Sequence, residues 1–435
     1  MKSLAVLSLM MAVLLGLAAG LCWGVESGTL KASVTTEGLP FPCIAGAVCK
    51  VTLDYANTGG ADVDLKDWSA SCIVDGKKIA ATLDPGAPLV AQPGKSVTAT
   101  MTITLPESAG GKDILLACGV NAGGKVAKTD FLVPVTPVFE ITLLPQRLIL
   151  DPNGSAKTLG MSVINHKDKP FTGKVTITVN KGLSVTPSQI AANIDSLGLE
   201  PYMLKVAPVG KPAPGHYTLW VDVDQRSREW AMIDVPAVAK KQTMKVDGNM
   251  GDWVGAQSVS ISHYVGSKAS TIGSARFAYD AKNLYVAIET YEQVQLANPN
   301  VKSDLPGGMI EIAIDPLIDG ANTAKGGFKA DDRAYDLVAA AKGAALLRTQ
   351  IGGKSVRQDT AFSVAVGKRG ANSIYETAIP WTEFKAFKPG PGKMIAISVL
   401  VNAPSGNNLH NNYEFGGGLW GDIDPRLFVP VVLGK

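Results

Sequence analysis

VTATMTITL, residues 97–105, decides the fold class, because apolar residues alternate strictly with threonine along it. Successive side chains of a β-strand point to opposite faces of the sheet, so this strand buries one face and exposes the other. The same period of two recurs in residues 49–55. Asp75 and Gly76 separate further alternating runs, as the residues of a hairpin turn do. We therefore predict an all-β chain.

The composition supports this prediction. Hydrophobic residues make up 46% of the 435 positions and charged residues 18%, with 46 glycines and 26 prolines. These proportions are typical of a turn-rich globular chain. The formal net charge is +3, and no lysine or arginine cluster contains interleaved aromatic residues, so we expect no nucleic-acid partner. A chain of this length holds about two to four domains, and we expect three β-sandwiches.

The first residues have the pattern of a secretory signal peptide. Lys2 precedes an apolar run that ends in small residues, so we expect residues 1–24 to be removed. A retained anchor helix is the alternative. Lipidation at Cys22 is disfavoured because Leu21 stands where such signals usually have a small residue. We expect a secreted, periplasmic or cell-surface protein with no membrane span after cleavage.

Two boundaries divide the remaining chain. Two prolines within residues 133–137 separate a first domain, residues 25–136, from a second domain, residues 137–237. Residues 237–242 show no core pattern and are interpreted as a linker. The third and largest domain then covers residues 243–435.

The first two domains share a turn signature. PGKS at residues 93–96 and PNGS at residues 152–155 each precede an alternating strand rich in polar residues. In this pattern both domains resemble the bacterial Ig-like spacer domains that accompany exported glycosidases and surface proteins. The resemblance implies Ig-like β-sandwiches.

Four cysteines lie in the first domain, which suggests two disulfides in an exported protein. Cys72 shares a strand face with Trp68, and Cys118 lies on another apolar strand face, so both thiols would point into the core. We therefore predict a Cys72–Cys118 disulfide and a short Cys43–Cys49 loop. A zinc site is the alternative, but the spacings do not match and no histidine lies nearby.

Four motifs mark the third domain. They are VDGN with DW at 246–249 and 252–253, FAYD with NLYV at 277–280 and 283–286, GMIEIAID at 308–315, and YETAIPW at 375–381. In their order and spacing they resemble family-9 carbohydrate-binding modules. The resemblance implies a jelly-roll-like sandwich that binds polysaccharide or oligosaccharide, with Trp253 and Trp381 packed in the core or at its rim.

Glu311 is the first candidate binding residue. Period two places Ile310 and Ile312 in the core and Glu311 on the opposite face, where a carboxylate can accept hydrogen bonds from sugar hydroxyls. The family resemblance implies that this glutamate contacts sugar. A solvated acidic strand face is the alternative.

The segment before the C-terminus supplies the other candidates. A sugar ring needs an aromatic plane with polar groups at its edge. We predict that Trp420 stacks on the sugar and that His410, Asn411 and Tyr413 surround it. The alternative is a surface loop anchored by a core tryptophan. Members of the family hold the sugar between two tryptophans, and the second tryptophan has no obvious counterpart in this sequence. The basic residues that reach sugar hydroxyls in the family also lack obvious counterparts, and Asp336 and His410 stand near their expected positions.

Calcium is a side hypothesis, and otherwise we expect no cofactor. Aspartates in loops supply the oxygen ligands that hard cations prefer, although no EF-hand spacing occurs. The candidate residues are Asp247, Asp252, Asp315, Asp319, Asp331, Asp332, Asp422 and Asp424. Solvated turn aspartates are the alternative.

The four histidines are scattered, and no nucleophile elbow, zinc-protease motif or phosphate loop occurs, so we expect no enzyme. A pair of glycosidase carboxylates far apart in the chain stays open. The competing hypotheses are an assembly protein of the cell envelope or extracellular matrix, whose third domain has no ligand, and a haem-binding electron-transfer domain. An envelope or enzyme partner stays unidentified.

Overall fold

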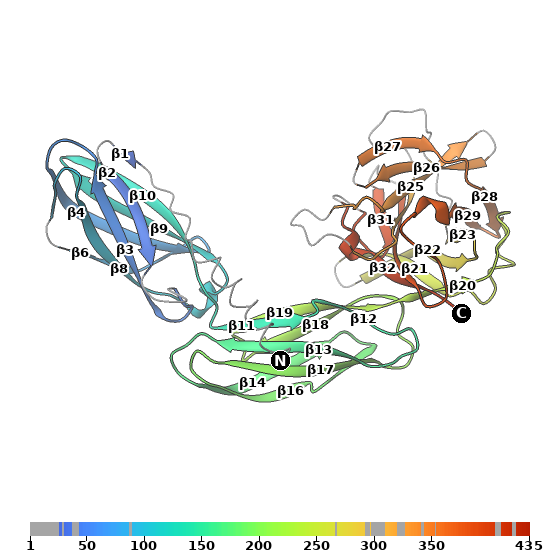
Figure 1. Ribbon diagram of the computed structural model, residues 1–435, viewed down its shortest axis with the longest axis horizontal. Coiled ribbons are helices and arrows are strands. Elements are labelled where there is room, and N and C mark those ends of the chain that lie inside the picture. Colours follow the sequence, from blue (N-terminus) through green and yellow to red (C-terminus); the bar gives the residue numbers. More distant parts are fainter. Residues whose placement is uncertain are drawn as a thin grey trace.

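The fold is all-β, as the alternating patterns predict, and it forms three β-sandwich domains, which Figure 1 shows as three bodies. The described part of the chain contains no α-helix, only the 3-10 turns η1 (Glu107–Ala109), η2 (Trp381–Glu383) and η3 (Pro425–Leu427). The computed structural model describes residues 26–27, 30–36, 43–86, 89–265, 268–291, 296, 309–319, 327–340, 343–352, 354–404, 410–419 and 423–435. The predicted signal peptide, residues 1–24, lies outside them.

Two antiparallel sheets make the first sandwich, with strand orders β1-β2-β3-β8-β6 and β10-β9-β4-β5, and β7 pairs with β4. The alternating stretch at residues 97–105 lies mainly in β8, whose inward residues are buried as predicted. The strands are β1 (Glu26–Ser27), β2 (Leu30–Thr36), β3 (Val48–Asn57), β4 (Val63–Val74), β5 (Lys77–Ile79), β6 (Ala81–Pro85), β7 (Val90–Ala91), β8 (Ser96–Thr104), β9 (Asp113–Ala122) and β10 (Lys125–Pro134).

One of the two predicted disulfides is present. Cys43 and Cys49 are bonded, whereas Cys72 and Cys118 are buried free thiols, so their predicted pairing is wrong. Both side chains do face the core, but β4 and β9 are neighbours in one sheet, and Cys118 lies opposite Ala70, two residues from Cys72. Diagonal neighbours lie about 7–8 Å apart, beyond the usual reach of a disulfide.

The second sandwich has sheet orders β11-β13-β17-β15 and β12-β19-β18-β14-β16. The edge strand β12 pairs in parallel with β19, and the remaining pairs are antiparallel. The strands are β11 (Phe139–Leu144), β12 (Arg147–Ile149), β13 (Lys157–Asn165), β14 (Phe171–Val179), β15 (Leu183–Thr186), β16 (Gln189–Ile194), β17 (Leu199–Pro208), β18 (Gly215–Val223) and β19 (Ser227–Val235).

The third sandwich is built from one 13-stranded sheet that continues from β27 through β24, β30 and β22 to β28. The strands are β20 (Ala237–Lys241), β21 (Ser258–Val265), β22 (Lys268–Tyr279), β23 (Asn283–Thr290), β24 (Met309–Asp315), β25 (Arg333–Ala340), β26 (Gly343–Ile351), β27 (Lys354–Asp359), β28 (Val364–Arg369), β29 (Asn372–Pro380), β30 (Met394–Pro404), β31 (His410–Phe415) and β32 (Val429–Leu433).

The segment interpreted as a linker is instead strand β20, which corrects that part of the domain prediction. It pairs in parallel with β22 and β32, and Ala237 and Ala239 are fully buried. Two alanines give a weak hydrophobic signal, which explains the misreading. The other domain limits drawn from the sequence stay predictions.

Three apolar clusters hold the third sandwich together. The main core lies between the layers and includes Trp381. A second cluster, with Trp253, covers the outer face of β22, β23 and β29, so both tryptophans are buried as predicted. A third cluster covers part of the outer face of β24, β25 and β30 with Leu419 and Phe428. The candidate site lies on this last face.

A buried polar contact joins the second and third sandwiches. Asp234 is fully buried; its carboxylate accepts a hydrogen bond from Arg147 Nε at 2.5 Å and contacts His216 Nδ1 at 2.7 Å. The same two side chains reach the third sandwich, where Arg147 Nη2 donates to the Phe428 carbonyl and His216 Nε2 contacts the Leu427 carbonyl. Both ring nitrogens of His216 therefore face oxygen acceptors.

Among the described residues, no helix has the length and apolar character that crossing a bilayer requires.

Candidate functional site

The outer face of β24 carries the first candidate residue where the sequence places it. Ile310, Ile312 and Ile314 are fully buried in the core, and Glu311 points to the other face. Glu311 is nevertheless only 8% exposed, because the outer face is itself partly covered. It lies within a layer and not on an open strand surface.

Acidic side chains lie beside Glu311 on the neighbouring strands. Glu311 is paired with Asp336 on β25 and with Leu400 on β30, and Leu400 is paired in turn with Glu414 on β31. Burial raises the pKa of Glu311 to about 8, with further contributions from the charges of Asp336 and Glu414. Glu311 is therefore mostly protonated at neutral pH, when it can donate a hydrogen bond as well as accept one.

Two asparagines form the adjacent row on the same face. Asn402 on β30 is paired with Asn412 on β31. Asn402 is 1% exposed, and both its amide nitrogen and its amide oxygen are buried without a hydrogen-bond partner. The amide oxygen of Asn412 is also buried without a hydrogen-bond partner. Buried polar atoms in native proteins almost always have a partner, either protein or water. These atoms are therefore ready to bond an incoming polar group.

We call these five residues the polar cluster. Its members are Glu311, Asp336, Asn402, Asn412 and Glu414. Glu311 and Asn402 are buried and form its floor, while the other three are half-buried and form its rim. Glu414 is held by the Leu419 backbone N–H, which donates to its Oε1 at 3.2 Å. Carboxyl and amide groups in this arrangement can bond hydroxyl or ammonium groups.

The other predicted sugar-binding residues are only partly located. Tyr413 lies on the opposite face of β31 and packs against the core, so the structure does not bring it together with Glu311. His410 and Asn411 begin β31 and pair with Pro404 and Ala403, and their side chains lie outside the description. Trp420 also lies outside the described residues.

The loop before Trp420 packs on the same face as the polar cluster. Leu419 is 5% exposed and belongs to the same apolar cluster as Leu400. Gly418 has a positive φ of 78°, and its carbonyl accepts a hydrogen bond from Asp424 N–H. A Cβ atom at Gly418 would lie 2.3 Å from the Asp424 carbonyl oxygen, so this close approach requires glycine.

Sequence reasoning missed Asn402 as a site residue, although a signal was present. Ile395, Ile397, Val399 and Val401 alternate along β30 and face the core, which by period two puts Asn402 on the outer face. What the pattern could not show is that β24 and β31 flank β30. Only that strand order places Asn402 beside Glu311.

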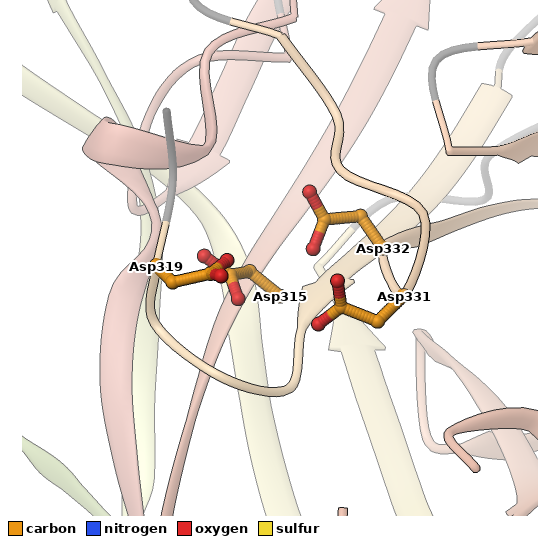
Figure 2. Close-up of side chains that lie close together, drawn as sticks. All are labelled: Asp315, Asp319, Asp331 and Asp332. Atoms are coloured by element: carbon orange, nitrogen blue, oxygen red, sulfur yellow. The ribbon is translucent and has the colours of Figure 1, made fainter. Parts of the chain in front are cut away.

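Four of the eight aspartates proposed for calcium come together. Asp315 ends β24 and Asp319 follows it, while Asp331 and Asp332 directly precede β25. One carboxylate oxygen from each aspartate lies within 4.8 Å of those of the other three. Figure 2 shows the four carboxylates directed into one space. We call them the aspartate cluster.

Asp332 is the most deeply buried member of the aspartate cluster. Asp332 is fully buried, its Oδ1 has no hydrogen-bond partner, and its Oδ2 accepts from the Lys329 N–H. Burial, followed by the charge of Asp315, raises the pKa of Asp332 to about 8. Among the described residues, one cation is paired with the cluster. It is the half-exposed ammonium group of Lys329, which lies 3.1 Å from the Asp319 carboxylate.

The remaining predicted calcium ligands have other roles or lie elsewhere. Asp247 pairs with Lys245, and Asp252 accepts a hydrogen bond from the Lys245 N–H. Asp424 caps η3 and pairs with Arg426. Asp422 lies outside the described residues.

Comparison with known proteins bears on the third sandwich. Residues 246–414 match the family model described as carbohydrate family 9 binding domain-like. A search of the curated proteins gave no match.

Several solved structures match at low similarity. Two are a family 9 carbohydrate-binding module from Caldicellulosiruptor kristjanssonii, in complex with cellotriose and with glucose. Each is 17% identical with a TM-score of 0.34; they cover 46% of this chain and 94% and 96% of their own chains, respectively. The secreted serine protease VesC from Vibrio cholerae matches at 11% identity and a TM-score of 0.19, over 38% of this chain and 44% of its own. By its match to the family model, the region of residues 246–414 is therefore similar to carbohydrate family 9 binding-like domains.

Proposed function

We propose that this is an exported, non-catalytic protein that binds carbohydrate through the polar cluster of its third sandwich. The observation that carries the proposal is the Asn402 amide, which is buried beside Glu311 with both polar atoms unpartnered. The match of this domain to a carbohydrate-binding family supports the same function.

The chemistry of the cluster suits sugar hydroxyls. Each hydroxyl donates one hydrogen bond and accepts others, and an asparagine amide can serve both needs, as can a protonated Glu311. In the free protein, ordered water would satisfy the Asn402 amide, and a hydroxyl that reproduces its hydrogen bonds can replace it. The rim residues Asp336, Asn412 and Glu414 would then contact the outer hydroxyls.

An aromatic plate would complete the site. Trp420 directly follows Leu419, which packs over Leu400 between Glu311 and Glu414. Stacking of a sugar on an indole adds about 1 kcal/mol beyond area burial, and each hydroxyl hydrogen bond adds about 1 kcal/mol. We therefore expect weak binding at a single site, with the two Ig-like domains acting as spacers.

Binding is tested by retention on insoluble polysaccharides and by titration calorimetry with oligosaccharides. Asn402→Ala and Trp420→Ala should each weaken binding about fivefold to tenfold or more. The matched control is Trp230→Ala, which removes a tryptophan that is 47% exposed on the second sandwich. Unchanged binding in folded Asn402→Ala and Trp420→Ala proteins would overturn the proposed site, and equal losses in Trp230→Ala would indicate nonspecific adhesion.

We also propose that the aspartate cluster holds a structural calcium ion. Calcium–oxygen bonds of about 2.3–2.6 Å put two ligands of one ion at most about 4.6–5.2 Å apart, and one carboxylate oxygen from each of the four aspartates lies within 4.8 Å of the others. The unpartnered, fully buried Oδ1 of Asp332 supports a cation there.

Calorimetry of chelator-treated protein tests the calcium proposal. Added calcium should raise the melting temperature of one transition, and Asp332→Asn should abolish that rise. Asp113→Asn, which removes an exposed carboxylate of the first sandwich, should keep it. A wild-type melting temperature that does not respond to calcium would refute the ion site.

A further inference from the structure

The contact between the second and third sandwiches is anchored on one buried charge. Asp234 is fully buried, and its carboxylate lies 2.5 Å from Arg147 Nε and 2.7 Å from His216 Nδ1. A buried carboxylate holds its partners more firmly than a surface ion pair does, because the loss of a partner leaves a charge unpaired away from water. Arg147 and His216 are therefore held in one orientation on the second sandwich.

Both side chains also contact backbone carbonyls at the end of η3. Arg147 Nη2 donates to the Phe428 carbonyl at 2.5 Å, and His216 Nε2 lies 2.5 Å from the Leu427 carbonyl oxygen. Leu427 is the last residue of η3, and Phe428 is its C-terminal cap. Carbonyls at the end of a helical turn lack partners within the turn. Polar groups of the neighbouring sandwich therefore hold η3 in place.

η3 in turn supports the loop that borders the polar cluster. The Asp424 N–H, at the start of η3, donates to the Gly418 carbonyl at 2.9 Å. A Cβ atom at Gly417 would lie 3.4 Å from the Leu427 Cβ and 3.8 Å from Glu414 Oε2, so the Gly417 backbone lies close to both. The loop thus has η3 on one side and the polar cluster on the other.

The same loop is bonded to the polar cluster. Leu419 donates its backbone N–H to Glu414 Oε1 at 3.2 Å. Its side chain belongs to the apolar cluster that also contains Leu400 and Phe428. Leu400 lies between Glu311 and Glu414 in the strand register. A displacement of η3 would therefore move Leu419, and with it the Glu414 carboxylate.

We infer that Arg147 and His216 are positioning residues of the carbohydrate site; this inference rests on the proposed function. They act through η3 and Leu419, which hold the Glu414 carboxylate at the rim of the polar cluster. Position matters because a hydrogen bond weakens steeply when its geometry departs from the optimum. The second sandwich is then more than a spacer, because it sets the geometry of a site whose five members all lie on the third sandwich.

The coupling has a reciprocal consequence. If the contact with the second sandwich strengthens sugar binding, a bound sugar must strengthen that contact by the same factor. A saturating oligosaccharide should therefore raise the melting temperatures of both the second and the third sandwich in the wild type. In Arg147→Ala it should raise the melting temperature of the third sandwich alone.

Affinity is measured by titration calorimetry of the full chain. The wild type is screened against glucose, xylose and mannose oligomers, and the one that binds most tightly is kept as the probe. Arg147→Ala should bind this probe about fivefold more weakly. His216→Gln, a milder change, should weaken binding about twofold to threefold. The matched control is Arg226→Ala, on the same sandwich, which removes ion pairs to Glu107 and Asp224 and should bind as the wild type does.

A double-mutant cycle separates positioning from a general loss of stability. Arg147 acts through the Glu414 carboxylate, so in a Glu414→Ala background the further change Arg147→Ala should cost little or no affinity. General destabilisation would instead weaken binding by the same factor in both backgrounds. Thermal scans establish that each variant is folded at the temperature of the titration.

The outcomes separate this inference from the proposed function. Wild-type affinity in folded Arg147→Ala and His216→Gln proteins would overturn the positioning role and leave carbohydrate binding intact. Equal factors in the two backgrounds of the cycle, or an equal loss in Arg226→Ala, would also overturn it. Binding of none of the oligomers to the wild type would overturn both the inference and the proposed function.

Discussion

Asp234 and Glu311 are both buried acids, but they lie in opposite electrostatic surroundings. Asp234, at the contact between the second and third sandwiches, is fully buried and bonded by Arg147 and His216. Glu311 is 8% exposed and has two further acids as its neighbours. A buried charge is costly unless it is paired. The first acid is therefore part of the scaffold, whereas the second is stable chiefly as a neutral group.

The aspartate cluster extends this comparison along the same two strands. The outer face of β24 and β25 carries Glu311 and Asp336 at one end and Asp315 and Asp332 at the other, with buried alanines between them. In the described part of the chain, neither Glu311 nor Asp332 has an arginine or histidine partner of the kind that Asp234 has. This difference is what points to ligands at the two ends.

The largest expected effect on stability comes from removing the Asp234 carboxylate. Asp234→Ala leaves Arg147 and His216 without their shared partner, and removal of one member of a buried ion pair costs about 3–5 kcal/mol. Calorimetry should show lower melting temperatures for the transitions of the second and third sandwiches. Asp64→Ala, which removes one partner of an exposed ion pair with Lys66, should leave the melting profile unchanged. Equal profiles for wild type and Asp234→Ala would mean that the contact does not stabilise the two domains.

Glu311, the acid without a cationic partner, should make the stability of the protein depend on pH. The pKa of Glu311 is raised to about 8, so between about pH 5 and 8 the folded chain binds more protons than the unfolded chain. The contribution of Glu311 to the free energy of unfolding is therefore complete below about pH 5. It is lost as the pH rises from about 5 to 8, at up to about 1.4 kcal/mol per pH unit.

Glu311→Gln removes the group that titrates. The variant should lose this slope and should exceed the wild type in stability at high pH, as chemical unfolding across the pH range would reveal. A slope that persists unchanged in Glu311→Gln would show that another group causes it.

The aspartate cluster should respond to a neutral substitution in a way that depends on calcium. In chelator-treated protein at neutral pH, Asp332 must take up a proton on folding because burial raises its pKa to about 8, and Asp332→Asn removes that requirement, so stability should rise by about 1–2 kcal/mol. With calcium present, the wild type should regain the advantage. Thermal unfolding of the wild type and of Asp332→Asn, in chelator and in calcium, tests both expected differences in stability. A destabilised variant under both conditions would show that the Asp332 carboxylate is needed for packing and not for an ion.

Much of the fold could be predicted from period two alone. The alternation in GMIEIAID placed the three isoleucines inside and Glu311 outside, as observed. Alternation identifies the face of a strand but not its neighbours in the sheet. For that reason Cys72 and Cys118 were correctly placed in the core and wrongly paired. The strand at Ala237–Lys241 was missed because alanine and lysine give little apolar contrast.

The candidate site was predictable only in part, for the same reason. Glu311 follows from one strand, but the polar cluster forms because β25, β24, β30 and β31 lie side by side, and residues from 311 to 414 meet there. Similarly, eight loop aspartates looked alike in the sequence. The pairing of β24 with β25 selects the four that meet.

The smallest expected effect on stability comes from replacing His216, the histidine that contacts Asp234. His216 Nδ1 lies 2.7 Å from Asp234 Oδ1, and Nε2 lies 2.5 Å from the Leu427 carbonyl oxygen, so each ring nitrogen contacts an oxygen acceptor. His216→Gln can keep one of these hydrogen bonds and should cost about 1 kcal/mol. For a domain of about 100 residues, such as the second sandwich, that loss lowers the melting temperature by about 4–8 °C, which calorimetry resolves. Leu427 is the last residue of η3, and the cap residue of η3, Asp424, donates its backbone N–H to the Gly418 carbonyl in the third sandwich. The thermal transition of the third sandwich should therefore shift together with that of the second. A shift confined to the second sandwich would show that the histidine only supports Asp234 and does not connect the two domains.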